Sequence, residues 1–140
     1  MSGHNKDDYS HLKVLIVEDN EVNQKVTQAM LQHFGINPGI AENGQVALEM
    51  ISQDKYDLIL MDCQMPELNG FETTIKIRNP DKDDGQRFKT DDKVAIIAMT
   101  ANAAPDDVKA CYAAGMNDFI AKPVELDIIK KILEKWHGSA

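Results

Sequence analysis

The sequence lacks the features that would commit it to a membrane, a disulfide framework or nucleic acid. No apolar run approaches the roughly 18 residues that span a bilayer, and no signal-peptide pattern is present. There are only two cysteines, Cys63 and Cys111, without C-x-x-C spacing, which favours a reducing, cytoplasmic setting. Basic residues number 15 against 23 acidic ones. The resulting net charge of -8 disfavours direct contact with nucleic acid or with a membrane surface.

What the chain does contain predicts one folded domain. Its 140 residues, 43% of them hydrophobic, suffice for a single core. Residues 1–11 are polar and aperiodic, so we expect a flexible lead-in or linker there, the domain at 12–137 and a short tail at 138–140. We expect no DNA-binding or catalytic output module, and hence either a stand-alone protein or a domain cut from a longer one.

Short apolar runs alternate with segments of helical periodicity. Strands are expected near 13–17, 36–41, 57–62, 94–99 and 118–122, and helices near 20–35, 43–51, 68–78, 105–115 and 126–136. In the first helix Val22, Val26, Met30 and Phe34 recur at helical spacing behind a capping residue, Asn20. This alternation predicts an α/β domain, a parallel sheet covered by helices on both faces.

One connection, NPDKDDGQRFKTDDK at 79–93, is longer than the usual αβ loop of about two to six residues. A calcium-binding loop with Gly85 at its sixth position would have Pro80 and Lys82 where acidic ligands are needed. We therefore expect a solvated insertion. It should lie at the end of the sheet away from any strand-end site, where it affects partner contacts more than chemistry.

Polar side chains stand where the predicted strands end. Glu18 and Asp19 follow the first strand, Asp62 ends the third, Thr100 follows the fourth and Lys122 ends the fifth. Each residue alone has a simpler explanation, as a helix-start acid, a turn residue, a β-branched strand residue or a solvated lysine. Because parallel strands bring their carboxyl ends to one edge, however, all five should converge there.

Three clustered carboxylates need a neutralising partner, because two unit charges about 4 Å apart repel by roughly 4 kcal/mol at an effective dielectric near 20. Lys122 and a divalent cation are the candidates. Carboxylate ligands suit Mg²⁺, and strand alternation turns Cys63 away from Asp62 towards the core. Such a site could accept a phosphoryl group on Asp62, with Mg²⁺ and Lys122 neutralising its oxygens and Thr100 donating a hydrogen bond.

The segments VLIVEDNEVNQKV, DLILMDCQMPELNGFE, IIAMTANA and DFIAKPV closely resemble the receiver domain of two-component response regulators, over residues 13 to about 136. The resemblance implies a flavodoxin-like, doubly wound sheet in the order 2-1-3-4-5 with five helices. The style of DNEVNQKV and MDCQMPELNGFE is most similar to receivers within hybrid sensor histidine kinases, whose parent protein could be membrane-anchored.

The resemblance also implies roles for individual residues. Asp62 matches the phospho-accepting aspartate. Glu18 and Asp19 match the acidic pair that organises Mg²⁺, with Asp19 a direct ligand and Glu18, in place of the more frequent aspartate, acting through water. Gln64 matches the position that lends its backbone carbonyl to the metal.

Further matches concern switching. Thr100 and Lys122 match the switch hydroxyl and the phosphate-binding lysine, and Lys122 precedes a proline at a bond that is usually cis in the family. Phe119 matches the switch aromatic, which would fill the space left when Thr100 moves inward and so shift the face built from 103–125. Gln64 and Asn102 flank the site and should tune the lifetime of the aspartyl phosphate.

The implied function is a phosphorylation-dependent switch that takes its phosphoryl group from a histidine kinase or a histidine phosphotransfer domain. It would hydrolyse its own aspartyl phosphate without being a turnover enzyme. Three alternatives are weaker. A dehalogenase-type phosphohydrolase wants a second acid where Gln64 stands, and a flavin phosphate would be repelled by the acidic loop after the first strand. A degenerate receiver that only binds partners would not need all five key positions filled.

Overall fold

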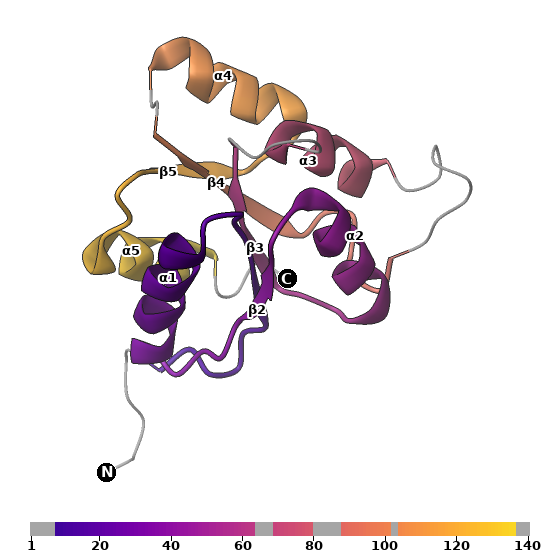
Figure 1. The fold of residues 1–140 in the computed structure, drawn as a ribbon. Helices are drawn as coiled ribbons and strands as arrows, with labels where there is room; N and C mark the ends of the chain where they lie inside the picture. The colour runs from indigo at the N-terminus through magenta and orange to yellow at the C-terminus, as the bar shows by residue number, and fades with distance from the viewer. Residues whose placement is uncertain (1–7, 64–68, 80–87, 102–103, 137–140) are drawn as a thin grey trace.

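The computed structural model describes residues 8–63, 69–79, 88–101 and 104–136. The strands are β1 (Val14–Val17), β2 (Gly39–Ala41), β3 (Leu58–Asp62), β4 (Ala95–Thr100) and β5 (Asp118–Ala121). The helices are α1 (Glu21–His33), α2 (Gly44–Gln53), α3 (Gly70–Arg78), α4 (Pro105–Ala114) and α5 (Leu126–Trp136). Figure 1 shows their arrangement around the sheet.

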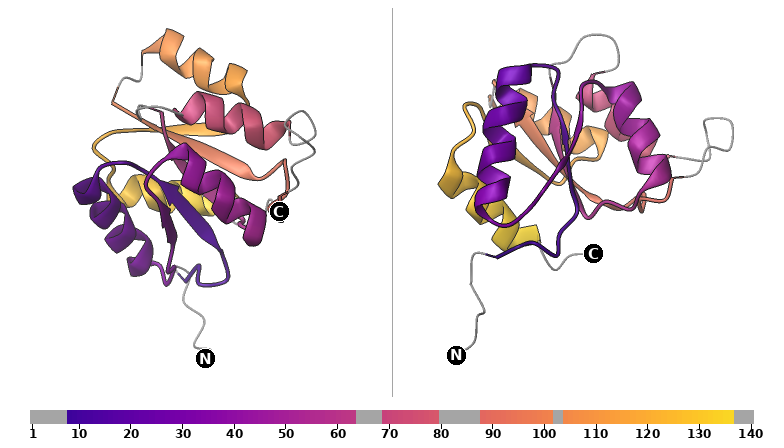
Figure 2. Two further views of the ribbon diagram at one scale, coloured as in Figure 1. Left: turned by 45° about the vertical axis from the view of Figure 1, so that its right-hand side comes forward. Right: turned by 60° about the horizontal axis from the view of Figure 1, so that its bottom comes forward.

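All five strands are parallel and lie in the order β2-β1-β3-β4-β5, which confirms the predicted fold. Helices α1 and α5 cover one face, and α2, α3 and α4 cover the other (Figures 1 and 2). Among the described residues, no helix combines the length and the apolar character needed to cross a bilayer. The short β2 forms one edge of the sheet, which suits the proline that precedes it.

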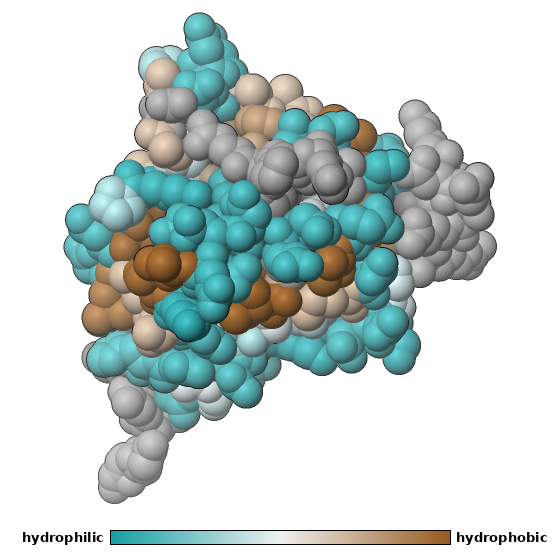
Figure 3. All heavy atoms as spheres, in the orientation of Figure 1, coloured by the Kyte–Doolittle hydropathy of each residue, from teal (hydrophilic) through white to brown (hydrophobic). Residues whose placement is uncertain are grey.

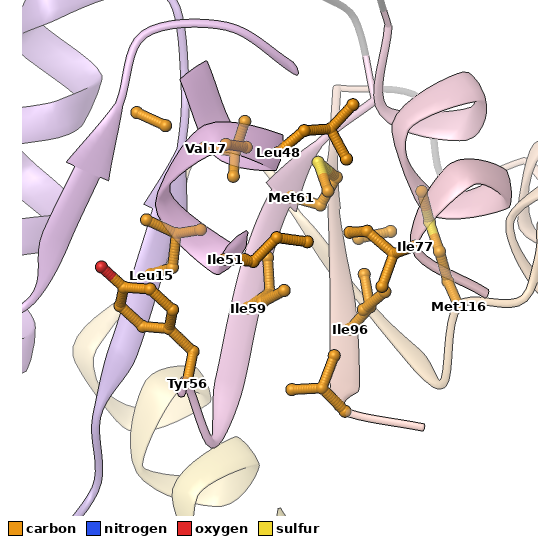
Figure 4. Close-up of a cluster of buried hydrophobic side chains, with 14 of the residues drawn as sticks. Leu15, Val17, Leu48, Ile51, Tyr56, Ile59, Met61, Ile77, Ile96 and Met116 are labelled. Atoms are coloured by element: carbon orange, nitrogen blue, oxygen red, sulfur yellow. The ribbon is translucent and has the colours of Figure 1, made fainter. Parts of the chain in front are cut away.

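The central strands are apolar on both faces because helices cover both. Every residue of β1, β3 and β4 is buried. Successive side chains along each strand point to opposite faces of the sheet and therefore enter two different hydrophobic clusters. One, seen in Figure 4, packs Leu15, Ile59 and Ile96 against α2 and α3. The other packs the alternate strand positions against α1 and α5. The sheet is therefore a rigid centre from which the strand ends project.

The spacing that predicted α1 did not predict its buried side. Asn20 caps the helix as expected, its side chain accepting a hydrogen bond from the Asn23 backbone amide at 2.9 Å. The helix buries Thr27 and Leu31, however, while Val22 and Val26 are 68% and 44% exposed. Two of the apolar residues that marked the helix in the sequence therefore lie on its surface.

Two segments expected to be solvated are partly packed. Tyr9, within the predicted lead-in, is buried, and its amide donates to the Phe34 carbonyl at 2.8 Å. In the second half of the 79–93 connection, Thr90 is also buried. Its hydroxyl accepts from the Tyr56 amide at 2.9 Å and donates to the Asp54 carbonyl at 2.7 Å. Thr90 thus departs from the predicted solvated insertion, whereas its neighbours Lys89 and Asp91 are exposed as expected. Residues 80–87 lie outside the described part.

Arg78, the last residue of α3, ties together the end of the sheet remote from the strand carboxyl ends. Its guanidinium donates to the carbonyls of Gly115, Asp92 and Val94 at 2.9, 2.7 and 2.8 Å, and to the Asn117 side chain at 2.8 Å. One side chain thus connects α3 with the start of β4 and with the loop between α4 and β5.

We expect Arg78→Met to lower the free energy of unfolding by about 2–4 kcal/mol, because it leaves the partly buried carbonyls of Gly115 and Val94 and the Asn117 side chain without this donor. Urea denaturation measures the loss. Lys109→Met, which removes a cation from the exposed surface of α4, should change stability by less than about 0.5 kcal/mol. Equal effects of the two substitutions would show that the hydrogen-bond network contributes nothing beyond the charge.

Candidate functional site

The carboxyl ends of the strands bring the predicted polar residues to one edge of the sheet. Glu18 and Asp19 directly follow β1, Asp62 ends β3 and Thr100 ends β4. Lys122 directly follows β5, and its amide donates to the Thr100 carbonyl at 2.8 Å. The parallel strands thus bring together the residues that the sequence predicted to meet at this edge.

The ammonium group of Lys122 lies between two of the carboxylates. Its Nζ is 3.1 Å from Glu18 Oε1 and 3.2 Å from Asp62 Oδ1. Both acidic side chains are only 2% exposed, against 20% for Lys122, so this is a buried ionic cluster rather than a surface ion pair. Burial lowers the pKa of Lys122, but the contacts with Glu18 and Asp62 more than offset this, and its pKa is raised overall.

Asp19 completes a group of three acids. One carboxylate oxygen from each of Glu18, Asp19 and Asp62 lies within 4.8 Å of the others, and Asp19 is exposed. Within the part of the chain that the structure describes, this is the one such cluster of metal-ligating side chains. Two buried acids and one open to water provide the hard oxygen donors that Mg²⁺ takes, together with room for its retained waters. The donor set fits a magnesium ion.

Lys122 supplies one positive charge, which does not compensate the negative charges of both Glu18 and Asp62. Its burial and the adjacent Asp62 raise the pKa of Glu18 from 4.5 to about 7, although the Asn20 amide and Lys122 act in the opposite direction. The Asn20 amide donates to Glu18 Oε2 at 3.2 Å. Without a cation, the site therefore holds its second buried carboxylate only at a free-energy cost.

Two residues that sequence reasoning missed support this edge. The Gln24 side chain donates to the Glu18 carbonyl at 2.7 Å, which fixes the turn between β1 and α1. At Gly70, the first residue of α3, a Cβ would collide with the carbonyl of Asp62 and crowd Cys63. The contact made by Gln24 could have been expected from the sequence, because Gln24 lies one helix turn after the capping residue Asn20 and so near the end of β1. No local signal reveals the second, because it depends on how closely α3 approaches β3.

The structure describes both residues that were predicted to act in switching, Thr100 and Phe119. Thr100 is buried, and Phe119 on β5 is half-buried against the cluster that contains Met61 and Ala98. The bond between Lys122 and Pro123 is cis, which confirms the expectation drawn from the resemblance. Gln64 and Asn102, predicted to tune the phosphoryl lifetime, lie outside the described residues.

The sequence matches the response regulator receiver domain family over residues 14–134. The chain belongs to this family. It is thus a receiver domain of two-component signalling, as the sequence motifs predicted.

Curated relatives place the receiver among signalling proteins that are far longer. It is 42% identical over 127 residues to hybrid signal transduction histidine kinase B of Dictyostelium discoideum, which covers 88% of this chain and 6% of that protein. It is 35% identical over 143 residues to the response regulator mcs4 of Schizosaccharomyces pombe, covering 89% of this chain and 27% of the relative. The receiver therefore spans only a small part of the length of these proteins.

Solved structures share the receiver's fold. The receiver domain of a Pseudomonas aeruginosa sensor histidine kinase, with magnesium coordinated in its active-site cleft, is 40% identical, with a TM-score of 0.77 and coverage of 91% of this chain and 98% of that one. The receiver domain of a Saccharomyces cerevisiae response regulator, crystallised with a histidine phosphotransfer protein, is 35% identical. Its TM-score is 0.80, with coverage of 91% and 89%.

The raised pKa of Glu18 predicts how the stability of the metal-free receiver depends on pH. The folded state retains a proton on Glu18 that the unfolded chain has lost, so the free energy of unfolding should fall as pH rises from 4.5 to 7. Each pKa unit corresponds to about 1.4 kcal/mol, so a shift from 4.5 to about 7 sets an upper bound of about 3.5 kcal/mol for the fall.

Urea denaturation across this pH range, compared with Glu18→Gln, measures the effect. The variant should lose the decline, and Mg²⁺ should remove it from the wild-type receiver by favouring the carboxylate. Parallel profiles for the two proteins without metal would assign the pH dependence to other groups.

Proposed function

We propose that Asp62 accepts a phosphoryl group from a phosphohistidine on a histidine kinase or a histidine phosphotransfer domain. The observation that carries this proposal is the buried Asp62 carboxylate at the end of β3, 3.2 Å from Lys122 and grouped with two further acids. A carboxylate that only closed a turn would need neither the cation nor the cluster.

The transfer needs an in-line nucleophile and compensation of charge. An oxygen of Asp62 attacks the phosphorus, the phosphorus–nitrogen bond to the donor histidine breaks, and the neutral imidazole leaves after taking up a proton. Lys122 then lies where it can pair with the oxygens of the transferred group. Glu18, Asp19 and Asp62 would hold Mg²⁺, which when bound supplies positive charge to the same oxygens.

Phosphorylation would act as a switch because it replaces the single charge of the Asp62 carboxylate with a phosphoryl group of about -1.5 to -2 charges beside the ends of β4 and β5. A shift from 1:99 to 99:1 needs about 5.5 kcal/mol. Two charge-assisted hydrogen bonds, from Thr100 and Lys122, would contribute about 1.5–3 kcal/mol each. The inward movement of Thr100 would let Phe119 follow and rearrange the surface formed by 103–125. Hydrolysis of the aspartyl phosphate would reset the domain, at a rate tuned by Gln64 and Asn102.

The donor would dock beside the acidic edge, on the exposed side of α1. Val22 and Val26 are exposed there, and hydrophobic atoms reach the surface over α1 among hydrophilic ones (Figure 3). Val26 also lines a hollow of about 140 Å³ together with Glu18 and Lys122. An apolar patch that continues into the acceptor site suits a partner that must present a histidine there. The co-crystallised yeast receiver supports a phosphotransfer domain as that partner.

The relatives also support a role within a histidine kinase. A Dictyostelium hybrid kinase and a Pseudomonas sensor kinase are both similar to this receiver. In such a parent, the receiver would relay a phosphoryl group internally or to a separate phosphotransfer protein, in a cytoplasmic compartment. This placement rests on sequence similarity and not on the geometry of the site.

Incubation with Mg²⁺ and acetyl phosphate should add one phosphoryl group to the receiver, detected by intact mass. Asp62→Asn should abolish the adduct because the amide is no nucleophile, and chelation of Mg²⁺ should suppress it. Asp57→Asn, which removes a carboxylate at the opposite end of the same strand, is the matched control and should label normally. A receiver labelled neither by acetyl phosphate nor by a phosphohistidine protein would instead be a degenerate binding module.

Val26→Glu should slow transfer from a phosphohistidine donor by about tenfold, equivalent to roughly 1.4 kcal/mol, because it places a charge in the apolar contact. Labelling by acetyl phosphate should stay unchanged. Ile75→Glu introduces the same charge at a 49% exposed position on α3, on the other face of the sheet, and should leave both reactions unaltered. If the α3 variant slowed transfer as much as the α1 variant, α1 would not be the docking surface.

A further inference from the structure

The two cysteines, far apart in the sequence, meet in the core. Cys63 directly follows Asp62, and its Sγ lies 3.7 Å from the Sγ of Cys111 on α4. Both residues are buried, at 4% and 1% exposed, and both carry thiols. The distance is a van der Waals contact between sulfur atoms, so no third side chain separates them.

Cys111 has a special position in α4. Among the residues of this helix, all of which the structure describes, it is the only buried one. The first turn, with Pro105, Asp106 and Asp107, is exposed, and the N-cap residue Ala104 has no side chain that can cap the helix. Cys111 is therefore the one side chain of this helix that enters the core fully, whereas Val108 and Ala114 are only half-buried. The Cys111 side chain touches the residue next to the phosphoryl-acceptor position.

We propose that Cys63 and Cys111 form a reversible intramolecular disulfide that fastens α4 to the end of β3 and restrains the phosphorylation switch. The second half of this statement rests on the function proposed above, whereas formation of the bond does not. The bond would join residues 48 positions apart, one directly after β3 and one in α4. Phe119, the proposed switch aromatic, packs against the cluster that contains both thiols, so the cross-link would act where the switch must move.

The oxidation balances with hydrogen peroxide. One sulfur attacks a peroxide oxygen, the oxygen–oxygen bond breaks, and a sulfenic acid and one water form. The second sulfur then attacks the first, the sulfur–oxygen bond breaks, and the second water leaves. Two electrons pass from the thiols to the peroxide, and the two thiol hydrogens end in water. A dithiol reductant reverses the reaction. Because both thiols are buried, peroxide reaches them slowly. The first sulfur to be oxidised then has the other cysteine as its neighbouring thiol.

The folded receiver would be treated with hydrogen peroxide, alkylated under native and then denaturing conditions, digested and mapped. The readout is the linked pair of peptides, because the seven methionines also gain oxygen and obscure the intact mass. We expect the Cys63 and Cys111 peptides to be joined in the monomer, and separated again by dithiothreitol. Cys63→Ala and Cys111→Ala should each abolish the linked pair. Thiols that stay reduced, or that proceed to sulfinic acid without a linked product, would refute the proposal.

Amide hydrogen exchange tests the restraint independently of phosphorylation. In the oxidised receiver, exchange of residues 105–114 should slow by at least about tenfold, and reduction should restore it. Unchanged exchange in a fully linked sample would refute the clamp.

Phosphorylation of both redox forms then separates the two proposals. We expect Asp62 to be labelled in both forms. Labelling should change the amide hydrogen exchange of residues 104–125 only in the reduced form. The same change in both forms would overturn the restraint, whereas failure of labelling in both would count against the proposed phosphoryl acceptor alone.

Discussion

The confinement of like charges at the ends of parallel strands is the constraint on which this receiver depends. Glu18 and Asp62 are buried beside one ammonium group, with Asp19 at the open side. The sheet can hold these charges in place because closely packed apolar side chains cover both faces of its strands. A looser scaffold would let the carboxylates move apart or reach water. The stability of the core thus maintains an electrostatically unfavourable arrangement of carboxylates, which a bound cation would relieve.

The features that were readable from the sequence are those that follow from strand direction. Parallel strands place every residue that follows a carboxyl end on the same edge, so Asp62, Thr100 and Lys122 could be brought together without knowing any side-chain conformation. The strand order and the cis bond before Pro123 came instead from the resemblance to receivers. The sequence pattern located all five helices, with ends that differ by at most two residues from those in the structure.

What the sequence did not predict depends on how elements approach one another. Val22 and Val26 mark a helix equally well whether they face the core or the solvent, and only the position of α1 on the sheet decides that Thr27 is buried instead. Thr90 lies in a charged stretch, but it satisfies the backbone of a distant loop. Gly70 is required by the close approach of α3 to β3. Each of these features depends on how two separate elements pack together, so no local sequence pattern records it.

The network around Arg78 has a consequence for how this domain can vary. Arg78 holds the chain to the fold just before residues 80–87, and Thr90 holds it just after them, its hydroxyl bridging the Tyr56 amide and the Asp54 carbonyl. The polypeptide is thus anchored on both sides of 80–87 by contacts made outside that stretch. An engineer who inserts a reporter or a recognition peptide between these two attachment points would therefore work at the end of the sheet opposite the acidic edge.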